Sequence, residues 1–188
     1  AEGVAELNDR FSSTANGQTA YPVVPDARAL EINQAWLDWS GDTAGVRVGR
    51  QALVLDNARF IGNVAWRQNM QTFDAAQLRW KPSKAMEVQA LYLDRVHRVN
   101  GDEARDPLAR ERRLKAPLLR VSHVVPGGSL VGYGYWIEDR DVASASTRTL
   151  GLRWNAARAV SKDWKGGLVL ERAQQVPTRG VEAACCTA

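Results

Sequence analysis

The sequence is poor in cysteine and histidine and has no long hydrophobic run, and each shortage excludes a class of protein. The 188 residues include two cysteines, which are adjacent, and two histidines. The sequence has no CxxC motif and no Cys/His spacing typical of a metal site. No segment approaches the roughly 18–20 apolar residues that a membrane-spanning helix needs. We therefore predict no metal site and no cofactor, and we interpret His97 and His123 as solvated or interfacial side chains.

Catalytic and nucleic-acid signatures are missing as well. The sequence contains no GxSxG, HExxH or GxGxxG motif and no phosphate-binding glycine loop. The net charge is +4, but the basic residues are spread along the chain, and their densest group, at 103–115, also contains acidic residues. We therefore expect neither an enzyme nor a nucleic-acid-binding protein.

Two residue types are abundant. Seven tryptophans outnumber the three phenylalanines and the four tyrosines, and 20 of the 25 basic residues are arginine. Hydrophobic residues make up 45% of the chain and charged residues 24%, which is typical of a folded protein rather than a disordered one.

Alternation of apolar and polar residues recurs along the chain, whereas helical periodicity is scarce. In the segment 130–137, Val131, Tyr133, Tyr135 and Ile137 share one face of a strand, and Leu130, Gly132, Gly134 and Trp136 share the other. The same pattern predicts eight strands, over 31–39, 45–51, 73–80, 86–95, 117–125, 129–138, 147–155 and 164–173.

The connections between the predicted strands alternate in length. Short connections follow the first, third, fifth and seventh strands, and the intervening connections, 52–72, 96–116 and 139–146, are longer. A meander with short turns at one end and long loops at the other is the signature of a membrane β-barrel. A soluble sandwich has no reason for this alternation. The predicted fold class is thus all-β, an antiparallel up-and-down transmembrane β-barrel.

Four tryptophans fit this architecture as a membrane-interface girdle. Each lies beside a short connection and shares the parity of the apolar face of its strand, and a barrel places such rings at the membrane–water boundary. The predicted girdle consists of Trp39, Trp80, Trp154 and Trp164.

The opposite faces of the strands are polar, which a water-filled interior tolerates and a packed core does not. We predict that this face lines a pore and contacts the solute. The strand residues in this set are Arg47, Gln77, Arg79, Gln89, Arg95, Arg120 and Arg153.

The long segment 52–72 adds Arg59 and Arg67 to the solute-binding candidates. One interpretation is a loop folded into the barrel, where a planar guanidinium binds a carboxylate through two hydrogen bonds. The other is a surface loop in which these arginines pair with Asp56 or Asp74. The sequence leaves both open.

The segment 29–80 resembles the alginate export family of outer-membrane porin-like proteins. The match is dense at 49–74 and weaker farther on, and it extends over about residues 12–175. The stretches that carry it are "ALEINQAWLDWSG", "VRVGRQALVLDNARFIGNVAWRQNMQTFDA" and "LGLRW". Members of the family are barrels of roughly 18 strands and about twice this length, so the resemblance implies about eight consecutive strands of a larger barrel. It also implies an electropositive channel for an acidic polysaccharide.

The resemblance suggests a division into three parts. Residues 1–28 would precede the first complete strand, 29–175 would form the partial barrel, and 176–188, with Cys185 and Cys186, would be an atypical, unstructured tail. The start of the chain has no charged or apolar region of a signal peptide. We expect the location to be the outer membrane of a Gram-negative cell.

Three functions are compatible with these features. The first is an outer-membrane channel for hydrophilic solutes, anionic or sugar-like, with membrane lipid and the solute as partners. The second is a small closed barrel that serves as an anchor or adhesin without a pore, for which eight strands suffice. The third is a soluble β-sandwich that binds carbohydrate through surface tryptophans. Protein partners, the solute and the direction of transport are left open.

Overall fold

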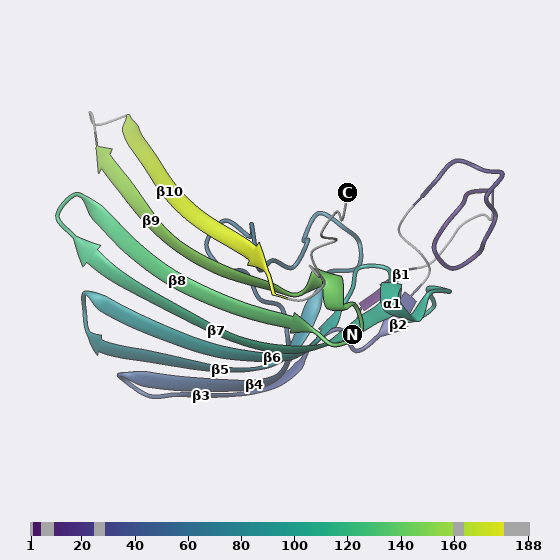
Figure 1. The fold of residues 1–188 in the computed structure, drawn as a ribbon, viewed down its shortest axis with the longest axis horizontal. Helices are drawn as coiled ribbons and strands as arrows, with labels where there is room; N and C mark the ends of the chain where they lie inside the picture. Colours follow the sequence, from purple (N-terminus) through teal and green to yellow (C-terminus); the bar gives the residue numbers. More distant parts are fainter. Residues whose placement is uncertain (1, 5–9, 25–28, 160–163, 179–188) are drawn as a thin grey trace, which may run out of the picture. The chain divides into compact units, whose positions relative to one another are not determined.

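The computed structural model describes residues 2–4, 10–24, 29–159 and 164–178. Eight strands form one sheet in the order β10-β9-β8-β7-β6-β5-β4-β3, so each strand lies beside its neighbour in sequence (Figure 1). A separate pair, β1 and β2, is antiparallel. The elements are β1 (Glu2–Val4), β2 (Ala29–Glu31), β3 (Ala35–Ser40), β4 (Ala44–Gln51), β5 (Thr72–Ser83), β6 (Met86–His97), α1 (Pro107–Arg110), β7 (Glu111–Val125), β8 (Gly128–Asp139), the 3-10 helix η1 (Ala143–Ala145), β9 (Thr147–Ala159) and β10 (Lys165–Pro177).

The predicted all-β fold is confirmed, and each predicted strand has a counterpart. The largest difference is at β7, which begins at Glu111 instead of residue 117. The charged stretch at its start was read as loop, yet it alternates between exposed Arg113 and Lys115 and buried Leu114 and Ala116. The first strand was also placed too early, because β2 ends at Glu31 and β3 begins at Ala35.

The alternation of connection lengths is confirmed in the described residues. The turns 41–43, 84–85 and 126–127 are short, and 52–71, 98–110 and 140–146 are longer. Because consecutive strands are neighbours, the short connections share one end of the strands, which we call the turn end, and the long ones share the loop end. None of the helices in the described part of the chain is long and apolar enough to cross a membrane.

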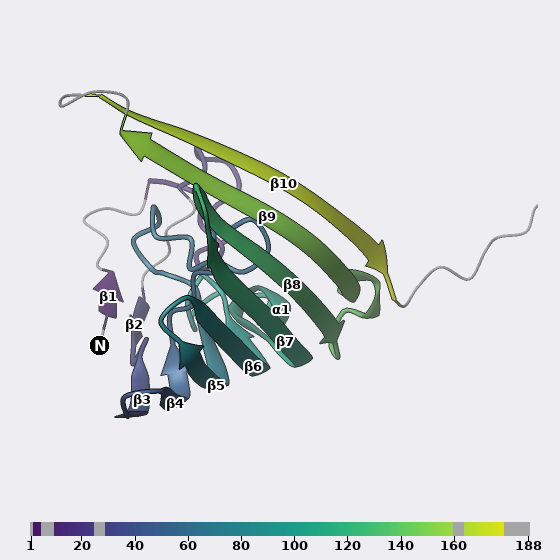
Figure 2. The ribbon, with the colours of Figure 1, turned by 90° about the vertical axis from the view of Figure 1, so that its left-hand side faces the viewer.

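β8 and β9 lie side by side in the sheet (Figure 2), and their register assigns the side chains to two faces. Leu150 and Leu152 lie opposite Gly134 and Gly132 on a face where the two leucines are 46% and 53% exposed. Tyr135 lies opposite Thr149 on the other face, where they are 2% and 1% exposed. We call these the exposed face and the buried face.

Gly151 is required by the packing of the buried face. It lies opposite Tyr133 in the register of β8 and β9. A Cβ atom at Gly151 would lie 2.2–2.5 Å from three atoms of the Tyr133 ring and hydroxyl. The tyrosine therefore crosses β9 where β9 has no side chain, and it stacks on Tyr135 with ring centroids 5.0 Å apart.

The chain divides into two compact units, each described by itself. Unit 1 contains residues 1–37, 48–75 and 93–114, and unit 2 contains residues 38–47, 76–92 and 115–188. The loop 52–71 in unit 1 buries Leu53, Leu55 and Ile61. Three of its non-glycine residues, Asp56, Ala58 and Val64, have φ between 52° and 60°. Such left-handed conformations persist only where the surrounding contacts hold them.

Candidate functional site

The turn end of β3 and β4 carries a cluster of polar side chains in unit 2. The Arg47 Nε donates a hydrogen bond of 2.7 Å to Asp38 Oδ1, and the Ser40 hydroxyl donates one of 2.9 Å to Asp38 Oδ2. Both oxygens of this carboxylate are therefore occupied, and Arg47 is neutralised locally.

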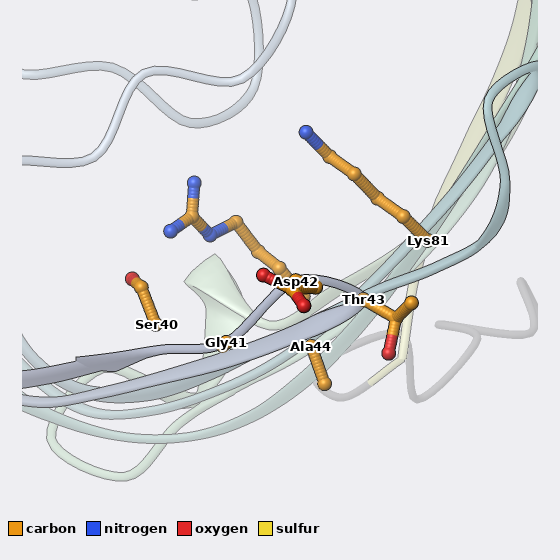
Figure 3. A pocket seen from close by; sticks show the side chains of 8 residues that line it. Ser40, Gly41, Asp42, Thr43, Ala44 and Lys81 are labelled. Atoms are coloured by element: carbon orange, nitrogen blue, oxygen red, sulfur yellow. The ribbon is translucent and has the colours of Figure 1, made fainter.

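Arg79 of β5 lies beside this cluster in a small cavity of about 80 Å³ (Figure 3). Ser40 and Lys81 extend to one side of the β3–β4 hairpin in Figure 3, whereas Thr43 and Ala44 lie on the other. A Cβ atom at Gly45 would make ordinary van der Waals contact with the Arg79 Nη2, at 3.5 Å, so the guanidinium lies beside this glycine. Among the described residues, no carboxylate forms an ion pair with Arg79, although Asp38 lies within range of its charge.

The neighbouring positions on β5 and β6 are polar but more fully paired. The Lys81 Nζ lies 3.4 Å from Glu87 Oε2, and the Gln89 amide donates to the other oxygen of Glu87. Gln77 is half-buried on β5.

Arg153 of β9 lies in a buried network rather than at an open surface. Its Nη1 is 3.4 Å from Glu171 Oε2 of β10, and the two side chains are only 12% and 10% exposed. The Tyr133 hydroxyl donates a hydrogen bond of 2.6 Å to Glu171 Oε1, and the Arg153 Nε donates one of 2.8 Å to Asn155. Glu171 thus neutralises Arg153 and also holds Tyr133 across three strands.

The loop end in unit 1 carries alternating charges on β4, β5, β6 and β7. The Arg50 Nε donates 3.0 Å to Asp74 Oδ1, and Asp74 Oδ2 is 2.8 Å from His97 Nε2. The His97 Nδ1 lies 3.4 Å from Glu111 Oε2, and Arg95 donates to the other Glu111 oxygen. We call these five residues the charge ladder.

The charge ladder corrects the expectation for His97. Its residue is only 8% exposed and lies between two carboxylates, so it is not solvated, whereas His123 is exposed as expected. Among the described residues, no group of three or more His, Cys, Asp and Glu side chains could hold a metal ion.

The loop 52–71 is tied to other parts of unit 1. Gln71 closes its base with bonds from its backbone N–H to Asn63 O and from its amide to Gly62 O, at 2.8 and 2.9 Å. Asn69 donates 2.7 Å to Glu31 Oε1. Arg67 lies over the exposed Trp66, with Cζ 5.2 Å from the ring centroid.

Neither open interpretation of the loop arginines is decided by these contacts. Arg59 is exposed, and Asp74, one of the two acids considered as their partner, is bound by Arg50 and His97. Roles for Arg59 and Arg67 in solute binding stay predictions.

Two of the four predicted girdle tryptophans, Trp39 and Trp164, lie at strand ends, whereas Trp80 and Trp154 lie within β5 and β9. Trp39, Trp80 and Trp164 are 61%, 49% and 74% exposed. Trp154 is half-buried and lies opposite Leu130 on the exposed face. Trp164 comes directly before β10.

Sequence reasoning missed several residues of these clusters. Trp136 lies opposite Arg148 at the loop end of the exposed face and is 41% exposed. The alternation in 130–137 puts Trp136 on the same face as Leu130. Trp136 is not beside a short connection, however, and the predicted girdle therefore does not include it. The acids Asp38 and Glu171 were missed as partners because cross-strand pairing depends on register.

The pore-lining positions are not brought together in one cluster. Arg47 and Arg79 lie at the turn end of unit 2, Arg153 lies in the β8–β10 network, and Arg95 lies in the charge ladder. Arg120 is half-buried on β7. Arg47, Arg95 and Arg153 thus each pair with a carboxylate on a neighbouring strand.

A comparison with protein families matches residues 4–113 to the model described as "Alginate export". The match includes the densest part of the expected resemblance and ends within β7. Comparisons with curated proteins and with solved structures found no match. The matched segment covers more than half of the chain and folds as an antiparallel meander of the predicted kind, and the chain therefore belongs to the alginate export family, a family of outer-membrane β-barrel transport proteins.

Proposed function

We propose that this chain supplies strands to the wall of an outer-membrane channel for hydrophilic solutes, anionic or sugar-like. The observation that carries the proposal is the alternation along β9 between exposed apolar side chains and buried polar ones. Leu150 and Leu152 are half exposed, whereas Thr149 is 1% exposed. An antiparallel sheet with one apolar exposed face suits lipid on that face and water on the other.

The exposed apolar band favours a membrane over a soluble fold. It continues on β10, where Leu168 and Leu170 are 50% and 54% exposed. Apolar surface removed from water is stabilised by roughly 25 cal/mol per Å², so a contiguous band of this kind marks a contact with lipid or a partner. All eight strands belong to one sheet, and this counts against a sandwich of two sheets.

The strand order also bears on the second alternative. In the described sheet, β3 and β10 are at opposite edges. A small closed barrel would pair its first and last strands, because closure removes the edges. The order therefore supports a contribution to a larger barrel over a self-contained anchor.

Arg79 is the strongest candidate for contact with an anionic solute. Arg47, Arg95 and Arg153 each have a carboxylate partner, whereas Arg79 has an open cavity beside it. A guanidinium keeps its charge at every working pH and binds a carboxylate through two parallel hydrogen bonds.

Planar-bilayer recording of the intact protein with Arg79→Gln tests this proposal. We expect an anion preference in the unmodified channel that falls by about fivefold in the variant, because one charge at about 4 Å in water is worth about 1 kcal/mol. The matched control is Arg172→Gln, whose residue lies opposite Leu152 on the exposed face of β10. An absence of channels, a cation preference, or an equal shift in the control would contradict the proposal.

A further inference from the structure

A buried histidine lies between the bases of two long loops in unit 1. His97 is the last residue of β6, directly before the loop 98–110, and Glu111 is the first residue of β7, directly after it. Asp74 lies near the start of β5, at the base of the loop 52–71. The His97 Nε2 is 2.8 Å from Asp74 Oδ2, and the Nδ1 is 3.4 Å from Glu111 Oε2. One imidazole ring therefore connects the bases of the two loops.

The ring faces a carboxylate at each nitrogen, and only one of its charge states suits both. A neutral imidazole carries one N–H and one bare nitrogen, whereas an imidazolium carries an N–H on each nitrogen. A bare nitrogen beside a carboxylate brings two acceptors together, and at a residue that is only 8% exposed water relieves this contact poorly. The imidazolium is therefore the state that contacts Asp74 and Glu111 favourably at the same time.

Charged groups face this site from every element packed against it. Arg50 of β4 donates 3.0 Å to Asp74 Oδ1, and Arg95 of β6 donates to Glu111 Oε1. A cavity of about 310 Å³ beside the ring is lined by Glu31, His97, Asp102, Pro107, Arg110 and Glu111. A polar cavity of this size has room for water, which can deliver a proton to the ring and take it away.

Histidine is the member of the charge ladder that changes its charge near neutral pH. A histidine gains or loses its proton between about pH 5 and 8, where carboxylates and guanidiniums keep their charges. As the pH rises through this range, the ring loses one N–H and with it one of its two favourable contacts. The stabilisation from the second contact is therefore present at acidic pH and lost as the pH rises.

We propose that His97 is a proton-dependent clamp on the loop 98–110. The protonated ring holds Asp74 and Glu111 together and so ties the base of this loop to the base of the loop 52–71. The neutral ring keeps the shorter contact, with Asp74, and releases Glu111. The loop 98–110 is thus held more firmly at acidic pH than at alkaline pH.

The clamp also acts on the segment 10–24, which the loop 98–110 holds. The Arg105 Nε and Nη2 each donate 3.0 Å to a backbone oxygen, of Ala15 and of Asn16. Long loops of outer-membrane barrels face the outside, so the clamp would respond to external pH. Only this orientation rests on the proposed function.

Hydrogen–deuterium exchange of the intact protein in detergent tests the clamp, because exchange reports local opening of the loop. Each rate is divided by the intrinsic rate of an unfolded chain at the same pH. We expect protection of the amides in 98–110 to be about fivefold higher at pH 5 than at pH 8, which is about 1 kcal/mol at 1.4 kcal/mol per factor of ten. The loop 140–146, which contains no histidine, is the internal reference and should not change.

Three variants assign the pH dependence to this contact. His97→Gln should abolish it, because an amide does not titrate. His123→Gln, at an exposed histidine of β7, is the matched control and should keep it. Glu111→Gln should abolish it while the loop stays protected, because the amide both donates and accepts and so contacts either charge state of the ring.

The outcomes separate a clamp from a histidine that only supports the structure. Equal protection of 98–110 at pH 5 and pH 8 in the unmodified protein overturns the inference, as does an equal pH dependence in 140–146. Unchanged pH dependence in Glu111→Gln also overturns it. If His97→Gln does not fold, the unmodified protein and Glu111→Gln still decide. Channel recordings play no part in this test, so its failure is distinguished from a failure of the proposed function.

Discussion

The strands at the loop end of unit 1 and the strands β8–β10 of unit 2 are held together in different ways. In unit 1, the charge ladder connects β4 to β7 through hydrogen bonds and one ion-pair contact between ionisable groups. In β8–β10, the Tyr133 ring packs over Gly151. The Tyr133 hydroxyl donates a hydrogen bond to Glu171, which forms an ion pair with Arg153. Half-exposed ion pairs contribute little, about 0–1 kcal/mol each, whereas buried packing and pairing depend strongly on geometry. We therefore expect β8–β10 to be far more sensitive to substitution than the ladder.

The largest effect is expected for Glu171→Ala. This change leaves the Arg153 guanidinium without its carboxylate and the Tyr133 hydroxyl without its acceptor. Removing one partner of a buried pair costs about 3 kcal/mol, and urea unfolding of the intact protein in detergent measures it. Gln174→Ala, at an exposed neighbouring position, is the control. A loss below 1 kcal/mol would show that this network is solvated and would remove the contrast with unit 1.

The next largest effect is expected for Gly151→Ala, because its Cβ would overlap the Tyr133 ring. Overpacking of this kind costs about 1–3 kcal/mol. The matched control is Gly132→Ala, since a Cβ there meets no atom within 4 Å. The temperature at which the folded band disappears in heat-modifiable gel mobility should fall for Gly151→Ala alone. If this temperature falls equally for Gly151→Ala and Gly132→Ala, the loss of stability comes from replacing glycine in a strand and not from the contact with Tyr133.

A smaller effect is expected for Asp74→Asn in the charge ladder. The variant weakens the contacts of Asp74 with Arg50 and His97, whose side chains are 30% and 11% exposed. We expect a loss of about 1 kcal/mol that shrinks as salt is added, because partly exposed pairs are screened. Unfolding at low and high ionic strength measures this, and exposed Asp94→Asn is the control. A loss as large as that of Glu171→Ala would contradict the comparison.

The smallest effect is expected in the loop 52–71, and it has the opposite sign. Val64 has φ 53°, a conformation that costs a β-branched residue about 1–2 kcal/mol and glycine almost nothing. After the added entropy of the unfolded chain, Val64→Gly should stabilise the protein by about 0.5 kcal/mol. Val54→Gly, at an exposed position without positive φ, should destabilise it. Chemical denaturation resolves the two, and destabilisation by Val64→Gly would show that the valine side chain holds this loop.

The strands and their connections could be read from the sequence because both leave local signals. Alternation marks which residues share a face, as in Leu150, Leu152 and Trp154, and short runs such as "PGG" mark tight turns. The start of β7 was misplaced for a local reason as well. Its exposed arginines and lysine have the composition of a loop, and only their neighbours' burial shows the alternation.

The contacts of the candidate site were much less accessible. Alternation puts Arg153 on the polar face, but its partner Glu171 is 18 residues away on the next strand. Which two residues meet depends on the register, and a shift of one residue would bring another face into contact. The same holds for His97, which the sequence predicts to be solvated or interfacial but which lies in the charge ladder.

The sequence by itself determined that this protein is an antiparallel meander with one apolar face, because period-two patterning and turn residues act over a few neighbouring positions. It also carried the resemblance to the alginate export family. Only the tertiary structure decided which arginines are neutralised and why Gly151 must be small. These properties arise from residues on different strands, and the register of hydrogen bonding between strands, rather than the order of residues within a strand, brings those residues together.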